Sequence, residues 1–174
     1  MGLNAEEFVA RLASARIGRT YNQYARSELR RTRLRAYLDE HADAPIVLVG
    51  EAAGYRGARV SGIPFTSERQ LTGNGPGEAS ATIVQRALAE LDLDVLCWNV
   101  VPTHPGTAIS NRPATRDEVE QSFGFLSDLA RGRRVLAVGR LAQAVTGAPY
   151  IRHPSHGGAA EFHAGLLQFS AGGR

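Results

Sequence analysis

Lysine is the most informative absence from this chain, because all 20 residues counted as Lys or Arg are arginine. Without lysine the chain cannot form a P-loop of the usual kind, nor a Schiff base between a lysine and its substrate, so both classes are excluded. Arginine still allows phosphate binding, since its planar guanidinium donates to two oxygens at once. The net charge of +3 permits a polyanionic partner but does not require one.

Cysteine and long apolar runs are also scarce. Cys97 is the only cysteine, which excludes an intramolecular disulfide and a metal site made of cysteines alone. No apolar run reaches the roughly 18 residues of a membrane span. The first residues lack the basic and then apolar pattern of a signal peptide. We therefore expect a cytoplasmic protein without membrane contacts.

Predicted strands and helices alternate along the 174 residues. Short, β-branched runs predict buried strands, and amphipathic spacing predicts helices. The strands are expected at 45–49, 94–99, 133–139 and 150–152, and the helices at 5–16, 22–41, 80–91, 116–130, 141–146 and 159–169. We predict one α/β domain over residues 1–174, in which helices in residues 1–44 precede a three-layer α/β/α core with a central four-stranded parallel sheet.

The helix predicted at 22–41 carries a run of arginines. Leu29 is expected to join its core-facing side, as is Phe123 on the helix predicted at 116–130. The arginines form either a phosphate-binding surface or a solvated helix face, which is the more usual meaning of such a run. They are Arg26, Arg30, Arg31, Arg33 and Arg35.

The first predicted strand leads into a turn of small residues that contains one carboxylate. The segment from Val47 to Gly54 includes Glu51, and Gly62-Ile63-Pro64-Phe65 follows. Glycine and alanine let a ligand approach the backbone closely. Open parallel sheets bind their ligands beyond the carboxyl ends of the strands. Taken alone, the pattern fits both a binding loop and an ordinary turn with a solvated glutamate.

Three of the four predicted strands end in a polar side chain, namely Glu51, Asn99 and His153. Parallel strands end at the same edge of the sheet, so these side chains are expected to meet there. A glutamate can activate water, an asparagine amide matches the edge of a pyrimidine, and a histidine can donate to a developing anion. The alternatives are local ones, in which the histidine only ends its strand and the asparagine satisfies nearby backbone groups.

Other ring side chains allow two interpretations as well. Phe65 could provide a flat face on which a base stacks, or it could pack in the core. His104 and His163 are interpreted as surface residues.

The motifs resemble those of the uracil-DNA glycosylase superfamily over about residues 45–167, most of all its bacterial and archaeal iron–sulfur branch, known as family 4. That branch uses four cysteines, so with Cys97 alone we expect no cluster, and no other metal or cofactor. Ala53 also replaces the proline of its first motif. The matching segments are Gly50-Glu51-Ala52-Ala53-Gly54, Gly62-Ile63-Pro64-Phe65, Asn99-Val100-Val101-Pro102, Asn111-Arg112-Pro113, Val138-Gly139-Arg140-Leu141-Ala142 and His153-Pro154-Ser155.

The resemblance implies roles for individual residues. Glu51 and His153 would be catalytic. The base would be held by Gly50, Ala52, Phe65 and Asn99. DNA would be contacted by Arg152, Ser155, His156 and Gly157, although the loop from His156 to Gly158 lacks an apolar wedge.

The implied activity is a DNA glycosylase that extrudes uracil or another deaminated base and hydrolyses its glycosidic bond. Since no lysine can form an imine, we expect a monofunctional enzyme that leaves an abasic site. It would act as a monomer on DNA with damaged bases. A catalytically silent nucleic-acid-binding protein of the same fold remains the alternative.

Overall fold

The computed structural model describes residues 3–172, so the first two and last two residues of the predicted domain lie outside it. Its centre is a four-stranded sheet in the order β2-β1-β5-β6, with every neighbouring pair parallel. The four strands are β1 (Ile46–Ala52), β2 (Val95–Val101), β5 (Arg134–Val138) and β6 (Tyr150–Ile151). The predicted central sheet is therefore confirmed.

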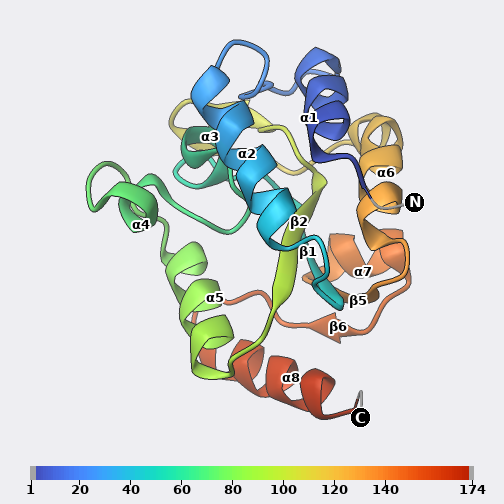
Figure 1. Cartoon of the computed structure of the whole chain (residues 1–174). Helices are drawn as coiled ribbons and strands as arrows, with labels where there is room; N and C mark the ends of the chain where they lie inside the picture. Colours follow the sequence, from blue (N-terminus) through green and yellow to red (C-terminus); the bar gives the residue numbers. More distant parts are fainter. Residues whose placement is uncertain (1–2, 173–174) are drawn as a thin grey trace.

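Helices cover both faces of this sheet. Figure 1 shows α6 and α7 together on one side, and α5 and α8 together on the other, which confirms the three-layer α/β/α arrangement. The helices are α1 (Ala5–Ser14), α2 (Glu28–Glu40), α3 (Ala58–Ser61), α4 (Glu68–Thr72), α5 (Ala79–Glu90), α6 (Arg116–Ala130), α7 (Arg140–Thr146) and α8 (Ala159–Ala171). None of the helices in the described residues is long and apolar enough to cross a membrane.

Some boundaries differ from those expected. Helix α2 begins at Glu28 because Ser27 caps it, with its hydroxyl accepting a hydrogen bond from the N–H of Arg30. The proline-rich loop after β2 contains an antiparallel hairpin of β3 (Gly106–Thr107) and β4 (Ser110–Asn111). Strand β1 runs past its predicted end and includes Glu51, and β2 continues two residues beyond Asn99, its predicted last residue.

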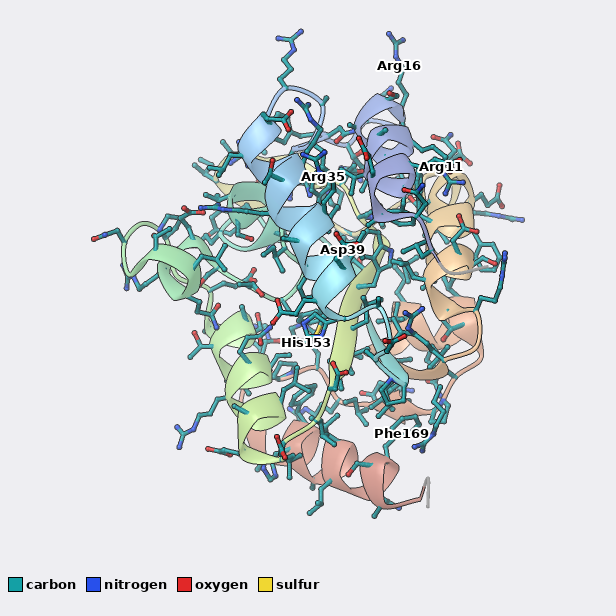
Figure 2. All side chains as sticks on the ribbon, in the orientation of Figure 1. Arg11, Arg16, Arg35, Asp39, His153 and Phe169 are labelled. Carbon is teal, nitrogen blue, oxygen red and sulfur yellow. The ribbon has the colours of Figure 1, made fainter. Side chains whose placement is uncertain are left out.

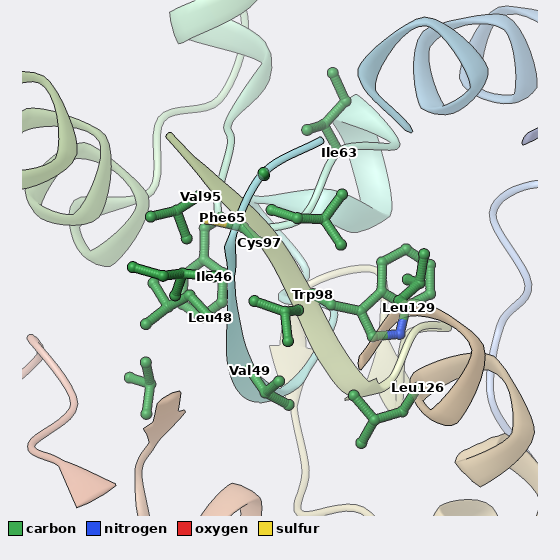
Figure 3. Packing of buried hydrophobic residues seen from close by; sticks show 14 of the residues in the cluster. Ile46, Leu48, Val49, Ile63, Phe65, Val95, Cys97, Trp98, Leu126 and Leu129 are labelled. Carbon is green, nitrogen blue, oxygen red and sulfur yellow. The ribbon is translucent and has the colours of Figure 1, made fainter. Parts of the chain in front are cut away.

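Trp98 of β2 is a large, fully buried side chain at the centre of the core. It points toward Leu126 and Leu129 of α6, on the opposite side of the strand from Phe65 and Cys97 (Figure 3). The ring of Phe8 from α1 lies edge-on to it, with the centroids 5.5 Å apart. The N-terminal helix is thus packed against the same core as the sheet.

Leu29 and Phe123 are exposed, so their predicted core positions were wrong. Each lies one position beside the buried stripe of its helix. On α2 the stripe contains Leu34, Tyr37 and Leu38, and on α6 it contains Glu118, Ser122, Leu126 and Leu129. Buried positions on a helix recur every three or four residues, so each stripe passes through a residue next to Leu29 or Phe123 and leaves these two side chains facing solvent.

The arginines of α2 mostly bind the protein itself. Arg30 donates to the carbonyl of Val60 at 2.8 Å, and Arg31 donates to the carbonyl of Tyr24 at 2.8 Å. Arg33 pairs with Glu68 and Arg35 with Glu28. Figure 2 shows Arg35 well separated from His153. These contacts favour a structural use of the run over a phosphate-binding surface.

Candidate active site

The carboxyl edge of the sheet contains a cavity of about 350 Å³. Glu51, Asn99 and His153 all line it, although they come from β1, β2 and the loop after β6. Phe65 and Ala52 line the same cavity. The structure thus brings together the three polar side chains that the strand-end argument selected, and adds an aromatic ring beside them.

Gly50 makes the close contact between these groups possible. It is paired with Asn99 across the β1–β2 register. A Cβ at Gly50 would overlap Cζ of Phe65 and would lie 2.9 Å from Oδ1 of Asn99. Only a residue without a side chain therefore lets the ring and the amide meet over this strand.

Phe65 combines the two uses considered for it, because it is buried with the core cluster and also lines the cavity. Its φ of 51° lies in the left-handed region, which a bulky residue rarely adopts. The amide of Gln85 on α5 donates to the Phe65 carbonyl at 3.0 Å. The backbone is thus fixed in the conformation that turns the ring toward Gly50.

The Glu51 carboxylate is exposed and lightly engaged. Its Oε1 accepts one hydrogen bond from the N–H of Ala114, at 3.1 Å, just before α6. This contact fixes the direction of the side chain across the cavity. The second oxygen is left to meet a water molecule or a positive charge.

His153 has its ring tautomer set by Ser155. The backbone N–H of Ser155 donates to Nδ1 of His153 at 3.2 Å, and the Ser155 hydroxyl lies 2.8 Å from the same nitrogen. Because Nδ1 accepts, Nε2 holds the hydrogen in the neutral ring. Burial lowers the pKa of His153, the charge of Glu51 opposes this, and His156 adds to it. The cavity therefore faces a neutral N–H donor.

A second cavity of about 370 Å³ adjoins the first and shares Glu51 and His153 with it. Arg152, Ser155 and His156 line it, all from the sequence-predicted DNA-contacting loop. Arg152 is already paired with Glu161, with 2.5 Å between Nη1 and Oε2. His156 has a φ of 53° and Gly157 a φ of 79°, so the loop turns sharply at its exposed end.

A family model described as the uracil DNA glycosylase superfamily matches residues 38–167. The chain belongs to the uracil-DNA glycosylase superfamily. This confirms the resemblance of the motifs to those of the superfamily as a whole. Members of the superfamily are DNA glycosylases.

The fold is similar to that of wild-type SMUG2 from Pedobacter heparinus, with a TM-score of 0.68. The match covers 97% of this chain and 95% of the SMUG2 chain, at 12% sequence identity. At that identity the likeness shows the fold alone. No curated protein matches the sequence.

Glu78 also lines the first cavity, and the sequence analysis did not identify it as a site residue. Its carboxyl group occupies the space that a Cβ would need at Gly54 and at Gly57. Burial raises its pKa, and the nearby Arg56 works in the opposite direction. It directly precedes α5, and no strand end marks it, so only its position in space reveals it.

His104 is fully buried, so its interpretation as a surface residue was wrong. Its Nδ1 lies 2.7 Å from the carbonyl oxygen of Ala53, and its Nε2 lies 2.7 Å from that of Thr107. Carbonyl oxygens only accept, so both contacts are hydrogen bonds only when both ring nitrogens carry hydrogen. His104 joins the loop after β1 to the β3–β4 hairpin, a contact that no sequence pattern indicates.

Arg112 also lines the cavity and is held from behind by Glu118 of α6. Two guanidinium nitrogens of Arg112 lie 2.6 and 2.9 Å from the two carboxylate oxygens. Glu118 also accepts from the backbone N–H groups of Thr115 and Arg19. These hydrogen bonds lower the pKa of the buried Glu118 to about 2. The sequence predicted the helix at 116–130 but not this ion pair.

Within residues 3–172, no cluster of three or more histidine, cysteine, aspartate or glutamate side chains is arranged to hold a metal ion.

Proposed function

We propose that this protein is a monofunctional DNA glycosylase that removes uracil or another deaminated base from DNA and leaves an abasic site. One observation supports this most: Glu51, Asn99, His153 and Phe65 line one cavity of about 350 Å³ at the carboxyl edge of the sheet. An extruded base would enter this cavity, because its glycosidic bond cannot be reached inside a duplex.

The base would be recognised by stacking and by hydrogen bonds. Phe65 presents a ring on which a flat base can stack. Asn99 is buried beside it and offers a donor and an acceptor from one amide, which match the N–H and carbonyl edge of uracil. The backbone at Gly50 and Ala52 would complete the contact with the base.

Bond cleavage would use His153 and Glu51. As the bond between C1′ of the sugar and the base nitrogen breaks, its electron pair leaves with the base. The Nε2–H of His153 would donate to the carbonyl oxygen that gains this charge. Water would then add to C1′ of the cationic sugar and give up a proton to Glu51. The base anion takes a proton from solvent.

The DNA strand would lie along the second cavity, against Ser155, His156 and Gly157. Arg152 would reach a phosphate only by exchanging its pairing with Glu161 for one with DNA. We further propose that the protein acts as a monomer in the cytoplasm, without a cofactor.

Incubation with single-stranded and duplex oligonucleotides that contain one uracil, followed by alkali, tests this proposal. We expect strand breaks at uracil that disappear with Glu51→Ala and with His153→Asn. His163→Asn on α8 is the matched control and should retain activity, because His163 lies outside both cavities.

Two results would oppose the proposal. DNA binding without breaks at uracil, hypoxanthine or xanthine would favour the catalytically silent binding protein. An absence of DNA binding at low salt, where phosphate contacts are strongest, would contradict both functions.

A further inference from the structure

The β3–β4 hairpin presents an apolar side chain to solvent. Ile109 lies in the turn between Thr107 and Ser110, and it is 82% exposed, more than any other large hydrophobic residue in the described chain. Single exposed apolar residues are common on protein surfaces. This one differs because of where its hairpin lies and how firmly the hairpin is held.

The hairpin has close polar contacts at its tip and at its base. At the tip, the hydroxyls of Thr107 and Ser110 lie 2.8 Å apart, and the N–H of Ile109 donates to Thr107 Oγ1 at 3.3 Å. At the base, Nε2 of the buried His104 lies 2.7 Å from the Thr107 carbonyl oxygen. These contacts hold Ile109 outward on a short, ordered support.

The hairpin also borders the base-sized cavity. Pro105 precedes β3, Asn111 ends β4, and both residues line the cavity with Glu51 and Asn99. The side chain of Asn111 accepts a hydrogen bond from the N–H of Tyr55 at 2.9 Å, which joins the hairpin to the loop after β1. Ile109 is therefore supported by the rim of the cavity that an extruded nucleotide would enter.

The loop after β6, which also borders the cavity at His153, presents no exposed apolar side chain of this kind. Between His153 and Gly158, the exposed positions are His156 and Gly157, and Pro154 is buried. Proteins that open a duplex commonly insert an apolar side chain between stacked bases, and this loop exposes none. In this region the hairpin supplies that side chain and the histidine loop does not.

We propose that Ile109 inserts into the base stack beside the extruded nucleotide and occupies the space that the nucleotide leaves. The β-branched side chain has few rotamers, so it loses little conformational freedom on insertion. Burying it among bases offsets part of the cost of unstacking them. This inference rests on the proposed glycosylase function and adds the element that opens the duplex.

Ile109→Ala tests the inference on matched duplex and single-stranded substrates. We expect kcat/KM on a uracil-containing duplex to fall by about tenfold to a hundredfold, the range that corresponds to burial of one isoleucine side chain. Activity on the single strand should stay within about twofold, because no stack must be held open. Ile109→Phe should retain most duplex activity. The control Leu167→Ala, an exposed residue on α8, should change neither.

A binding measurement separates failure of this inference from failure of the proposed function. A duplex with 2-aminopurine beside the uracil should fluoresce more strongly with the wild type than with Ile109→Ala, whether or not the bond is cleaved. Equal fluorescence, or equal loss of activity on both substrates, would overturn the insertion. An altered elution volume of Ile109→Ala in size-exclusion chromatography would instead assign Ile109 to contact with a second copy. A wild type inactive on both the duplex and the single-stranded uracil substrate would contradict the glycosylase function itself.

Discussion

Two glutamates lie near the carboxyl edge of the same sheet in opposite surroundings. Glu51 is exposed and accepts one hydrogen bond from the described protein, from the N–H of Ala114. Glu118 is buried and accepts from Nη1 and Nη2 of Arg112 and from two backbone N–H groups. One carboxylate keeps an oxygen available at a cavity, and the other has its acceptor positions occupied by the protein.

The difference distinguishes a carboxylate that is available for a reaction from one that stabilises the structure. A group that must act on water cannot have all its lone pairs occupied by the protein. A group that must hold a loop works best when they are all occupied, because a buried, half-satisfied charge is costly. Glu118 fixes Arg112 and thereby the cavity wall near Pro113, whereas Glu51 faces the interior of the cavity.

Glu51→Gln should produce the largest effect, and it should be confined to activity. Glutamine can still accept from Ala114 but cannot take a proton from water, so we expect excision of uracil to slow by about a thousandfold. The melting temperature should stay within about one degree of the wild type, as measured by calorimetry. If Glu51→Gln lowered the melting temperature as much as Glu118→Gln does, the two glutamates would not differ in their structural role.

Glu118→Gln should have the converse effect, on stability. Removing the charge leaves Arg112 without its buried partner, which should cost about 3 kcal/mol in the free energy of unfolding. The melting temperature should fall by about 6 to 12 °C. Glu120→Gln is the control, because Glu120 forms only an exposed pair with Arg116 and should cost less than about 1 kcal/mol.

The same pair predicts how stability depends on pH. Folding lowers the pKa of Glu118 from 4.5 to about 2, so the folded state releases this proton more readily than the unfolded state. Its contribution is therefore fully present above about pH 4.5 and is lost as pH falls toward 2. Urea unfolding of the wild type and of Glu118→Gln should converge over that interval. Curves that stay parallel would contradict the assignment.

Gly50→Ala should have a smaller effect on uracil excision. This variant alters the cavity and leaves both carboxylates unchanged. The new methyl group would displace the Phe65 ring and the Asn99 amide. Forced shifts of this kind cost about 1 to 3 kcal/mol, so we expect uracil excision to fall by about tenfold to a hundredfold. Gly124→Ala on α6 is the control, since nothing lies within 4 Å of the added Cβ. If both variants retain full activity, Gly50 does not position the base.

The sheet and the meeting of its strand ends could be predicted from the sequence. Buried parallel strands are nearly continuous apolar runs, and their common direction places Glu51, Asn99 and His153 at one edge. Neither inference needs any knowledge of how the loops fold. The register that pairs Gly50 with Asn99 does not follow from the common strand direction and is seen only in the structure.

The loop contacts could not be predicted in this way. His104 is buried because the N-terminal segment at Tyr21 pairs with its backbone, from more than eighty positions away in sequence. The burial of Glu118 depends on Arg19 and Arg112, while the capping pattern of α6 is the same for an exposed helix. Local spacing contains no information about such partners, so the scaffold of the cavity was harder to predict than the polar side chains at the strand ends.

The smallest expected effect concerns His153 and tests whether its neutral form is the working one. Protonation at Nδ1 would place its new N–H opposite the N–H of Ser155, which now donates to that nitrogen, and two donors cannot form a hydrogen bond with each other. Since folding lowers the pKa of His153, the neutral ring persists as pH falls through the usual histidine range. Activity should therefore hold through that range and fall only below it. Stability should already decline as pH falls from the ordinary value of 6.5 toward the lowered pKa of the folded state, because the unfolded chain binds this proton more readily over that interval.

His156→Asn provides the discriminating variant for this titration. The charge of His156 contributes to lowering the pKa of His153, so its removal should move the pKa of His153 upward. Proton NMR of the His153 ring would follow the shift directly, and the acid limb of kcat/KM should move with it. If the ring titrated well above the usual histidine value in the wild type, His153 would enter the reaction at neutral pH as a cation. The base would then leave against a full positive charge, and the hydrogen bond from Ser155 would have no part in orienting the donor.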